Sequence, residues 1–177
     1  MGETSEHGYP MSNVGPEGRS YRAIDITDLR RLLRIAQNDQ IGFFENHPKW
    51  ARLYSRRKIC IALCQGAALH YTNGCTGIND FDVYTFYRKH PSKDVYPKRI
   101  KSYDFGNPKF GQSQDKPDFV GRRVDCLVRS IDTVSGEDAV TSIHRYLMGG
   151  DTKTARLLAE KAVILLEPNC GEVIWPR

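Results

Sequence analysis

Three aspartates stand in stretches whose other residues are typical of buried strands. Asp80 and Asp82 open the apolar run 80–87, and Asp125 lies inside the later run 123–128. Side chains at positions i and i+2 of a strand point to the same face, so Asp80 and Asp82 are expected to project together. If Asp125 joins them, carboxylates about 4 Å apart repel by about 4 kcal/mol at an effective dielectric of about 20. Such a cluster either takes up protons or holds cations.

The chemistry of these carboxylates favours hard divalent cations. Oxygen ligands at this charge density suit Mg²⁺ or Mn²⁺ better than zinc. Two such ions, about 3.5–4 Å apart, can hold both the attacking and the leaving oxygen of an in-line displacement at phosphorus. The pattern therefore predicts Asp80, Asp82 and Asp125 as catalytic, metal-binding residues of a phosphoryl or nucleotidyl transfer site. The structural alternative is that the first two form a turn cap and a solvent-facing acid, while Asp125 pairs with a nearby arginine.

Other enzymes with an Asp-x-Asp motif fit this chain less well. In haloacid-dehalogenase phosphatases and many glycosyltransferases the motif ends an apolar strand, whereas here a loop at 73–79 precedes it and the apolar run follows. No Gly-x4-Gly-Lys-Ser/Thr run is present for phosphate binding of the Walker type. Cys60, Cys64, His70 and Cys75 have none of the usual zinc-ligand spacings.

Elements around the aspartates are predicted from periodicity and from turn residues. An apolar strand at 58–64 runs into a glycine turn and a short helix through His70, ahead of the Asp80 strand. The long polar segment 106–120 is a candidate substrate loop or lid. Further elements are helices at 25–38 and 48–57, strands at 98–105 and 121–130, a helix capped by Ser135, and a helix from Asp151 to Pro168. This order predicts an α/β or α+β fold with a small mixed β-sheet flanked by helices.

The order of strand, glycine turn, Asp-x-Asp strand and later acidic strand resembles the polymerase-beta nucleotidyltransferase superfamily. It is most similar to the small bacterial branch that includes minimal nucleotidyltransferases and abortive-infection toxins. The similar stretch covers residues 58–130, where Gly66 takes the place of the family's glycine turn. The resemblance implies a nucleotidyltransferase-like core with added N- and C-terminal helices.

The resemblance also implies a reaction and a role for each matching residue. A nucleoside monophosphate would pass from an NTP to a hydroxyl acceptor on a nucleic acid such as tRNA, a protein or a small molecule, with two Mg²⁺ or Mn²⁺ ions. Asp80 and Asp82 would bind both ions, and Asp125 would help to activate the acceptor hydroxyl. Gly66, lacking a Cβ, would let the backbone approach the triphosphate. The expected nucleotide contacts are Gln65, Gly66, Ala67, His70 and Arg123, although for His70 a packing role is favoured over a contact with base or phosphate.

Two positions depart from the family pattern and motivate an alternative function. The turn is Gln65-Gly66-Ala67 where the family has Gly-Gly or Gly-Ser, and Ile78 stands where the small branch has Ser or Thr. The alternative is a catalytically silent module of the same fold that binds a nucleic acid or a protein partner. Other basic residues able to contact a triphosphate, or simply to lie on the surface, are Lys98, Arg99, Lys101, Arg122 and Arg129.

Composition and charge set the wider expectations. The 177 residues suit one domain, with a flexible tail at 1–20 and a folded part at 21–177, in which the last helices span 135–167. A net charge of +5 suits phosphate-bearing partners as well as plain solubility. No apolar run nears the roughly 20 residues that cross a bilayer, and the N-terminus has no secretory pattern. With an odd count of five cysteines, a cytoplasmic protein with no membrane partner is expected. A toxin of a two-gene pair is a further hypothesis.

Overall fold

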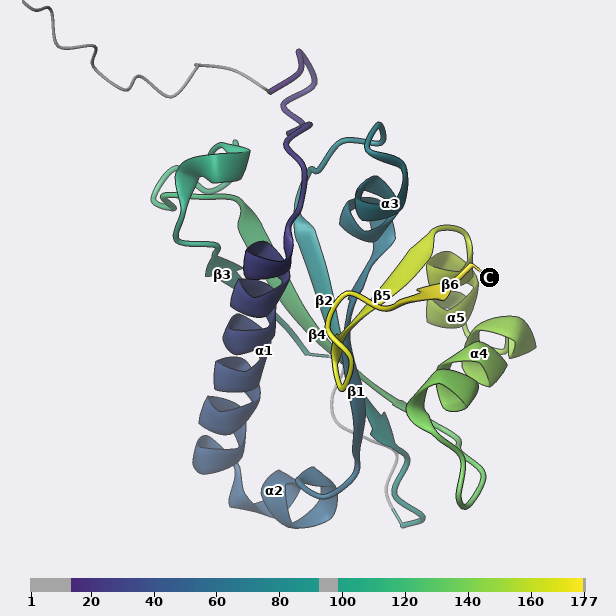
Figure 1. The fold of residues 1–177 in the computed structure, drawn as a ribbon. Helices are drawn as coiled ribbons and strands as arrows, with labels where there is room; N and C mark the ends of the chain where they lie inside the picture. The colour runs from purple at the N-terminus through teal and green to yellow at the C-terminus, as the bar shows by residue number, and fades with distance from the viewer. Residues whose placement is uncertain (1–13, 93–98, 177) are drawn as a thin grey trace, which may run out of the picture.

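The computed structural model describes residues 14–92 and 99–176 and contains one six-stranded mixed sheet with helices on both faces (Figure 1). The predicted α/β class is confirmed. The strand order is β3-β4-β2-β1-β5-β6. The strands are β1 (Lys58–Cys64), β2 (Phe81–Arg88), β3 (Ile100–Asp104), β4 (Arg123–Ile131), β5 (Ala162–Glu167) and β6 (Val173–Trp175). The α-helices are α1 (Ile26–Asn46), α2 (Pro48–Tyr54), α3 (Gln65–Asn73), α4 (Ala139–Gly149) and α5 (Lys153–Ala159), and a short 3-10 helix, η1, spans Pro108–Phe110.

The register of the sheet decides which side chains meet at its centre. β2 and β4 run parallel, whereas β1 is antiparallel to β2, and β3 is antiparallel to β4. Asp82 is opposite Asp125 on β4 and opposite Cys64 on β1, and Asp125 is opposite Ser102 on β3. Directly paired residues point to the same face. The sequence thus places one row of Cys64, Asp82, Asp125 and Ser102 across four strands.

One face of the sheet is covered by α1 and α3. Leu29, Leu32 and Ala36 of α1 are fully buried against alternate residues of β1, β2 and β4. The helix starts with a capping box, in which Asp25 and Asp28 each accept from the other's backbone N–H. The predicted helix at 25–38 is right at its start but continues to Asn46, because Phe43 also packs near the lower end of the sheet against α2.

The opposite face is covered by α4 and α5. Ile143 and Leu147 of α4 and Leu158 of α5 pack on Tyr84, Phe86 and other residues of that face. Asp138, and not Ser135, caps α4, since its carboxylate accepts from the Thr141 N–H. The predicted cap was wrong because residues 135–138 form a turn ahead of the helix.

The last predicted helix was wrong over its second half. α5 is capped by Thr152 rather than Asp151 and ends at Ala159, and residues 162–167 form the strand β5. β5 lies between β1 and β6 and is buried on both sides, since Ala162, Ile164 and Leu166 face the α1 core while Val163 and Leu165 face the α4 core. A strand buried on both faces is apolar at every position, so its sequence has no period of two to distinguish it from a helix.

Two segments far apart in the sequence meet at the upper end of the sheet in Figure 1. Ser20 exchanges backbone hydrogen bonds with Ile78 at 2.9 and 2.7 Å, so the flexible tail predicted for 1–20 does not extend over residues 14–20. The carboxylate of Asp104 accepts from three backbone N–H groups, of Gly106, Val120 and Gly121, and closes the base of the predicted 106–120 loop. These contacts hold the base of the loop in place.

The remaining predicted bounds differ by a few residues. The second helix ends at Tyr54 instead of Arg57, and the last strand of the predicted core starts at Arg123 instead of residue 121. Within residues 14–92 and 99–176, no helix is long and apolar enough to cross a membrane.

Candidate functional site

Four carboxylates gather at the end of the sheet where β2 and β4 begin. Asp80 precedes the first residue of β2, Asp82 is its second residue, and Asp125 is paired with Asp82 on the parallel neighbour β4. The fourth, Asp115, comes from the 106–120 loop. The side chains of Asp80 and Asp125 keep 21% and 15% of their surface exposed, so they are sheltered but open to a ligand. The three predicted acids therefore do share one end and one region of the sheet.

A single guanidinium lies among these acids. Arg123, the first residue of β4, bonds through Nη2 to Oδ2 of Asp80 and through Nη1 to Oδ2 of Asp115. Its Nε lies 3.2 Å from Oδ2 of Asp125 as an ion pair without hydrogen-bond geometry. The other Asp125 oxygen, Oδ1, accepts from the Ser102 hydroxyl at 2.6 Å. Arg123 was expected to contact nucleotide, and here its charge is engaged by three carboxylates.

Asp82 is the acid of the four that does not pair with Arg123, and its pKa is shifted upward. Burial, together with the charges of Asp80 and Asp125, raises the pKa of Asp82 from 3.8 to about 7. Arg123 and Lys161 act in the opposite direction but do not cancel the effect. The four carboxylates also outnumber Arg123 and Lys161, the two cations that act on them, and such an excess is the condition under which carboxylates take a proton or a metal ion.

The donor set decides which metal would suit the cluster. Asp80, Asp82 and Asp125 offer only hard oxygen atoms, which match Mg²⁺ or Mn²⁺. In the described part of the chain, however, no group of three His, Cys, Asp or Glu side chains is arranged to hold an ion, and Arg123 supplies the positive charge. Zinc is disfavoured as well, because burial raises the pKa of the Cys60 thiol to about 12 and that of Cys64 well above its usual value.

The turn between β1 and α3 lies beside Asp82, because Cys64 is its register partner. Gln65 has φ of 64°, the one positive value among the described residues other than glycine, and it starts α3. Gly66 has an ordinary φ, and a Cβ added there would meet no atom within 4 Å. The space beside Gly66 is therefore open, as a ligand approach requires.

Two of the expected nucleotide contacts point away from this open side. Ala67 is buried in the core under α1 and α3. His70 is only 2% exposed and uses both ring nitrogens, with Nε2 3.0 Å from the Arg22 carbonyl and Nδ1 accepting the Gly77 N–H at 3.1 Å. The packing role favoured for His70 therefore holds, and neither side chain enters the proposed site.

The other basic residues singled out by the sequence are engaged elsewhere. Arg122 is 1% exposed, and its guanidinium donates to the carbonyls of Gly18, Asn79 and Phe110. Arg99 bonds to the buried Asp39 under α1, and Arg129 donates to Thr154 and covers the Tyr84 ring. Lys101 lies 5.1 Å from the centre of the Tyr103 ring. Lys98 lies outside the described residues.

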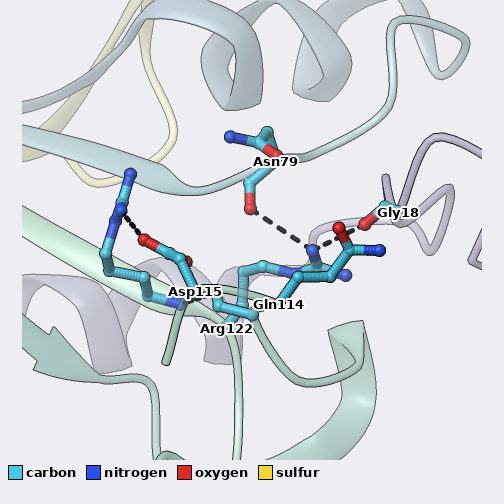
Figure 2. Close-up of a pocket in the computed structure, with 7 residues that line it drawn as sticks. Gly18, Asn79, Gln114, Asp115 and Arg122 are labelled. Carbon is cyan, nitrogen blue, oxygen red and sulfur yellow. Dashed lines mark hydrogen bonds and ion pairs between the residues drawn. The ribbon is translucent and has the colours of Figure 1, made fainter. Parts of the chain in front are cut away.

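Sequence reasoning missed three members of the site. Ser102 and Asp115 contact the acid cluster directly, and Lys161 lowers the pKa of Asp82 from the start of β5. Of these three, only Ser102 could have been found from the sequence, because it lies in a predicted strand with an alternating polar and apolar pattern. A pocket of about 220 Å³ adjoins Arg123 and Asp115 and is also lined by Asn79 and Gln114 (Figure 2).

Comparisons of this chain with protein-family models, with curated proteins and with solved structures found no match.

Proposed function

We propose that this protein is a metal-dependent nucleotidyltransferase that moves a nucleoside monophosphate from an NTP to a hydroxyl acceptor. The observation that carries the proposal is the pairing of Asp82 with Asp125 on adjacent parallel strands, with Asp80 two residues away. The resemblance of the 58–130 stretch to the polymerase-beta nucleotidyltransferase superfamily supports it further. A cytoplasmic location fits the free cysteines among the described residues.

The chain's own residues divide the work between two sides of the acid cluster. On the β1 side, the open space at Gly66 and the first N–H groups of α3 suit a triphosphate, since a helix N-terminus favours anions. On the β4 side, Asp125 is the candidate to accept the proton of an acceptor hydroxyl, with Ser102 orienting its carboxylate at 2.6 Å. Arg123 is the group able to leave the acids and meet phosphate oxygens, because its side chain is about a quarter exposed at 23%.

Asp80, Asp82 and Asp125 are the residues that would hold Mg²⁺ or Mn²⁺. A bound ion would neutralise charge on the phosphates and acidify the acceptor hydroxyl. Arg123 would have to give up its contacts with Asp80 and Asp125 for the carboxylates to turn toward such an ion.

The experiment that tests the function is label transfer. We would incubate the protein with each α-labelled NTP, Mg²⁺ or Mn²⁺, and a set of acceptors that includes tRNA, protein and small alcohols. Transfer is expected for the wild type, and a loss of at least about a hundredfold is expected for Asp80→Ala and Asp125→Asn. Asp118→Asn, an exposed acid of the same loop as Asp115, is the matched control. Transfer that survives Asp80→Ala unchanged would refute the site, and growth arrest on expression would favour the toxin hypothesis.

A second candidate is the catalytically silent binding module. The observation that favours it is Arg123, whose ion pairs with Asp80 and Asp125 stabilise the acids without a metal. Calorimetry with MgATP and MgGTP separates the two candidates. Binding that requires the divalent ion supports the enzyme, whereas the module predicts no such requirement.

A further inference from the structure

The pocket next to Arg123 lies between three segments that are distant in the sequence. Its walls come from the N-terminal segment, from the residues just before β2, and from the loop before β4 (Figure 2). Its volume is about 220 Å³. The lining residues are Gly18, Asn79, Ser113, Gln114, Asp115, Arg122 and Arg123. Since Arg123 and Asp115 belong to both the pocket and the acid cluster, a group held in the pocket would lie beside the acids.

The lining is polar throughout. None of the described lining residues has an aromatic or aliphatic side chain, so the pocket offers no aromatic ring on which a nucleobase could stack. It offers two amides, Asn79 and Gln114, each with donors and an acceptor. The buried hydroxyl of Ser113 accepts the Arg123 N–H at 2.7 Å and keeps its own hydrogen to donate. This mixture of donors and acceptors matches hydroxyl groups, which also donate and accept.

The charges in the pocket favour a neutral ligand. Arg122 donates through Nε, Nη1 and Nη2 to the backbone carbonyls of Gly18, Asn79 and Phe110, so most of its N–H groups are engaged by the backbone. Arg123 is engaged by Asp80, Asp115 and Asp125. Asp115 lines the same pocket with 55% of its side chain exposed, so a phosphate held there would lie close to a carboxylate. A neutral group bearing several hydroxyls meets no such repulsion.

We infer that this pocket binds the acceptor as a neutral sugar with neighbouring hydroxyl groups. Planar amide and carboxylate side chains can each bond two adjacent hydroxyls, and Asn79, Gln114 and Asp115 supply three such groups. One hydroxyl of the bound sugar would lie toward Arg123 and the acids beyond it. The inference rests on the proposed function for the step that follows binding, but the binding itself is testable without it.

Gly18 provides a second way to alter the pocket. Its φ is +76°, and a Cβ built there would lie only 2.6 Å from Nε2 of Gln114. Gln114 is an exposed side chain, so it can be displaced without disturbing the core. Gly18→Ala should therefore move the Gln114 amide out of position, while Gln114→Leu removes its polar atoms and keeps its bulk.

The test measures binding of sugar probes by NMR titration of the full chain, with no NTP or metal present. One pair of probes is methyl riboside and its 2,3-dideoxy analogue, and the other is a short oligoribonucleotide with a 2′,3′-diol end and its dideoxy-ended form. We expect the diol probes to bind the wild type and Asp118→Asn, and to bind Gln114→Leu and Gly18→Ala about tenfold more weakly, as loss of one or two hydrogen bonds predicts. The arm that binds more tightly identifies the source as a free sugar or an RNA end.

Equal affinity of the diol and dideoxy probes, or of the wild type and both variants, would overturn the inference. Thermal unfolding of each variant confirms that it is folded before the titration. Because no NTP is used, failure of diol binding leaves the label-transfer result standing, and failure of label transfer leaves the diol result standing.

Discussion

The raised pKa of Asp82 makes the stability of this protein depend on pH in a defined direction. In the folded protein the pKa of this carboxyl is about 7, whereas an unshifted aspartate has 3.8. Between these values the folded state holds a proton that the unfolded state has lost. The contribution of Asp82 is therefore fully present below about pH 4 and is lost as pH rises through 7. Because asparagine cannot ionise, we expect Asp82→Asn to remove this loss of stability at higher pH.

The difference between about 7 and 3.8 corresponds to about 4 kcal/mol as an upper limit. Asp82 is partly exposed, and Arg123, Lys161 and the neighbouring acids can shift to relieve the repulsion, so about half of that value is realistic. Asp82→Asn should match the wild type at pH 3.5, below both pKa values, and exceed it by about 2 kcal/mol at pH 8. For a chain of this length that is a rise of about 4–8 °C in Tm.

The assay is urea unfolding followed by tryptophan fluorescence at both pH values, with Asp118→Asn as the exposed control. A difference of the same size at pH 3.5 and pH 8 would refute the electrostatic cause, as would no difference at all. Adding millimolar Mg²⁺ at pH 8 extends the test to the proposed metal. The ion should stabilise the wild type and not Asp82→Asn, because only a ligand of the folded state raises the free energy of unfolding.

Three further predictions concern residues that the fold uses in specific ways. Arg122→Met should cost about 3 kcal/mol in urea unfolding, because it leaves buried backbone carbonyls without a donor, and Arg122→Lys should recover less than half. Gln65→Gly should raise stability by about 1 kcal/mol, because glycine adopts a positive φ without strain, and an unchanged Tm would contradict that. Asp138→Ala should lower the free energy of unfolding by about 1 kcal/mol, whereas Ser135→Ala should change it by less than about 0.5 kcal/mol. A larger loss for Ser135→Ala than for Asp138→Ala would instead support Ser135 as the cap.

The sequence predicts well those elements whose local pattern is compatible with only one type of secondary structure. The capped start of α1 and the strand β1 before its turn are examples, because caps and strongly apolar runs act over few residues. β5 fails for the opposite reason. Its five successive buried residues satisfy a helix and a strand equally, and the choice is made by pairing with β1, more than 90 residues earlier in the chain. The three-residue β6 has too little pattern of its own and depends on β5 for its formation.

The same distinction holds for the site. Asp80, Asp82 and Asp125 are recognisable because an acid in a strand contradicts its neighbours, and such a contradiction needs no alignment to be seen. Arg122 and Arg123 are adjacent and identical in type, yet successive residues of an extended chain point to opposite sides. Arg122 therefore donates to buried carbonyls of three other segments, whereas Arg123 pairs with the acid cluster. Only the fold decides which of the two arginines takes which role. The same is true of His70, whose partners Arg22 and Gly77 come from separate loops.

Arg123 is the residue on which the two candidate functions differ most. A lone cation that meets Asp80, Asp115 and Asp125 does for the cluster what a divalent ion would do, so it stabilises the site when no metal is bound. In a silent module that pairing would be the final state. In an enzyme it would be the resting state, since the guanidinium must give way before the acids can turn to an ion. The number of acids favours the second view: Arg123 pairs with Asp80, Asp115 and Asp125, and Asp82 lies beside them as an acid that the arginine does not pair with. A cluster evolved only to be satisfied by its own arginine would not need that fourth acid.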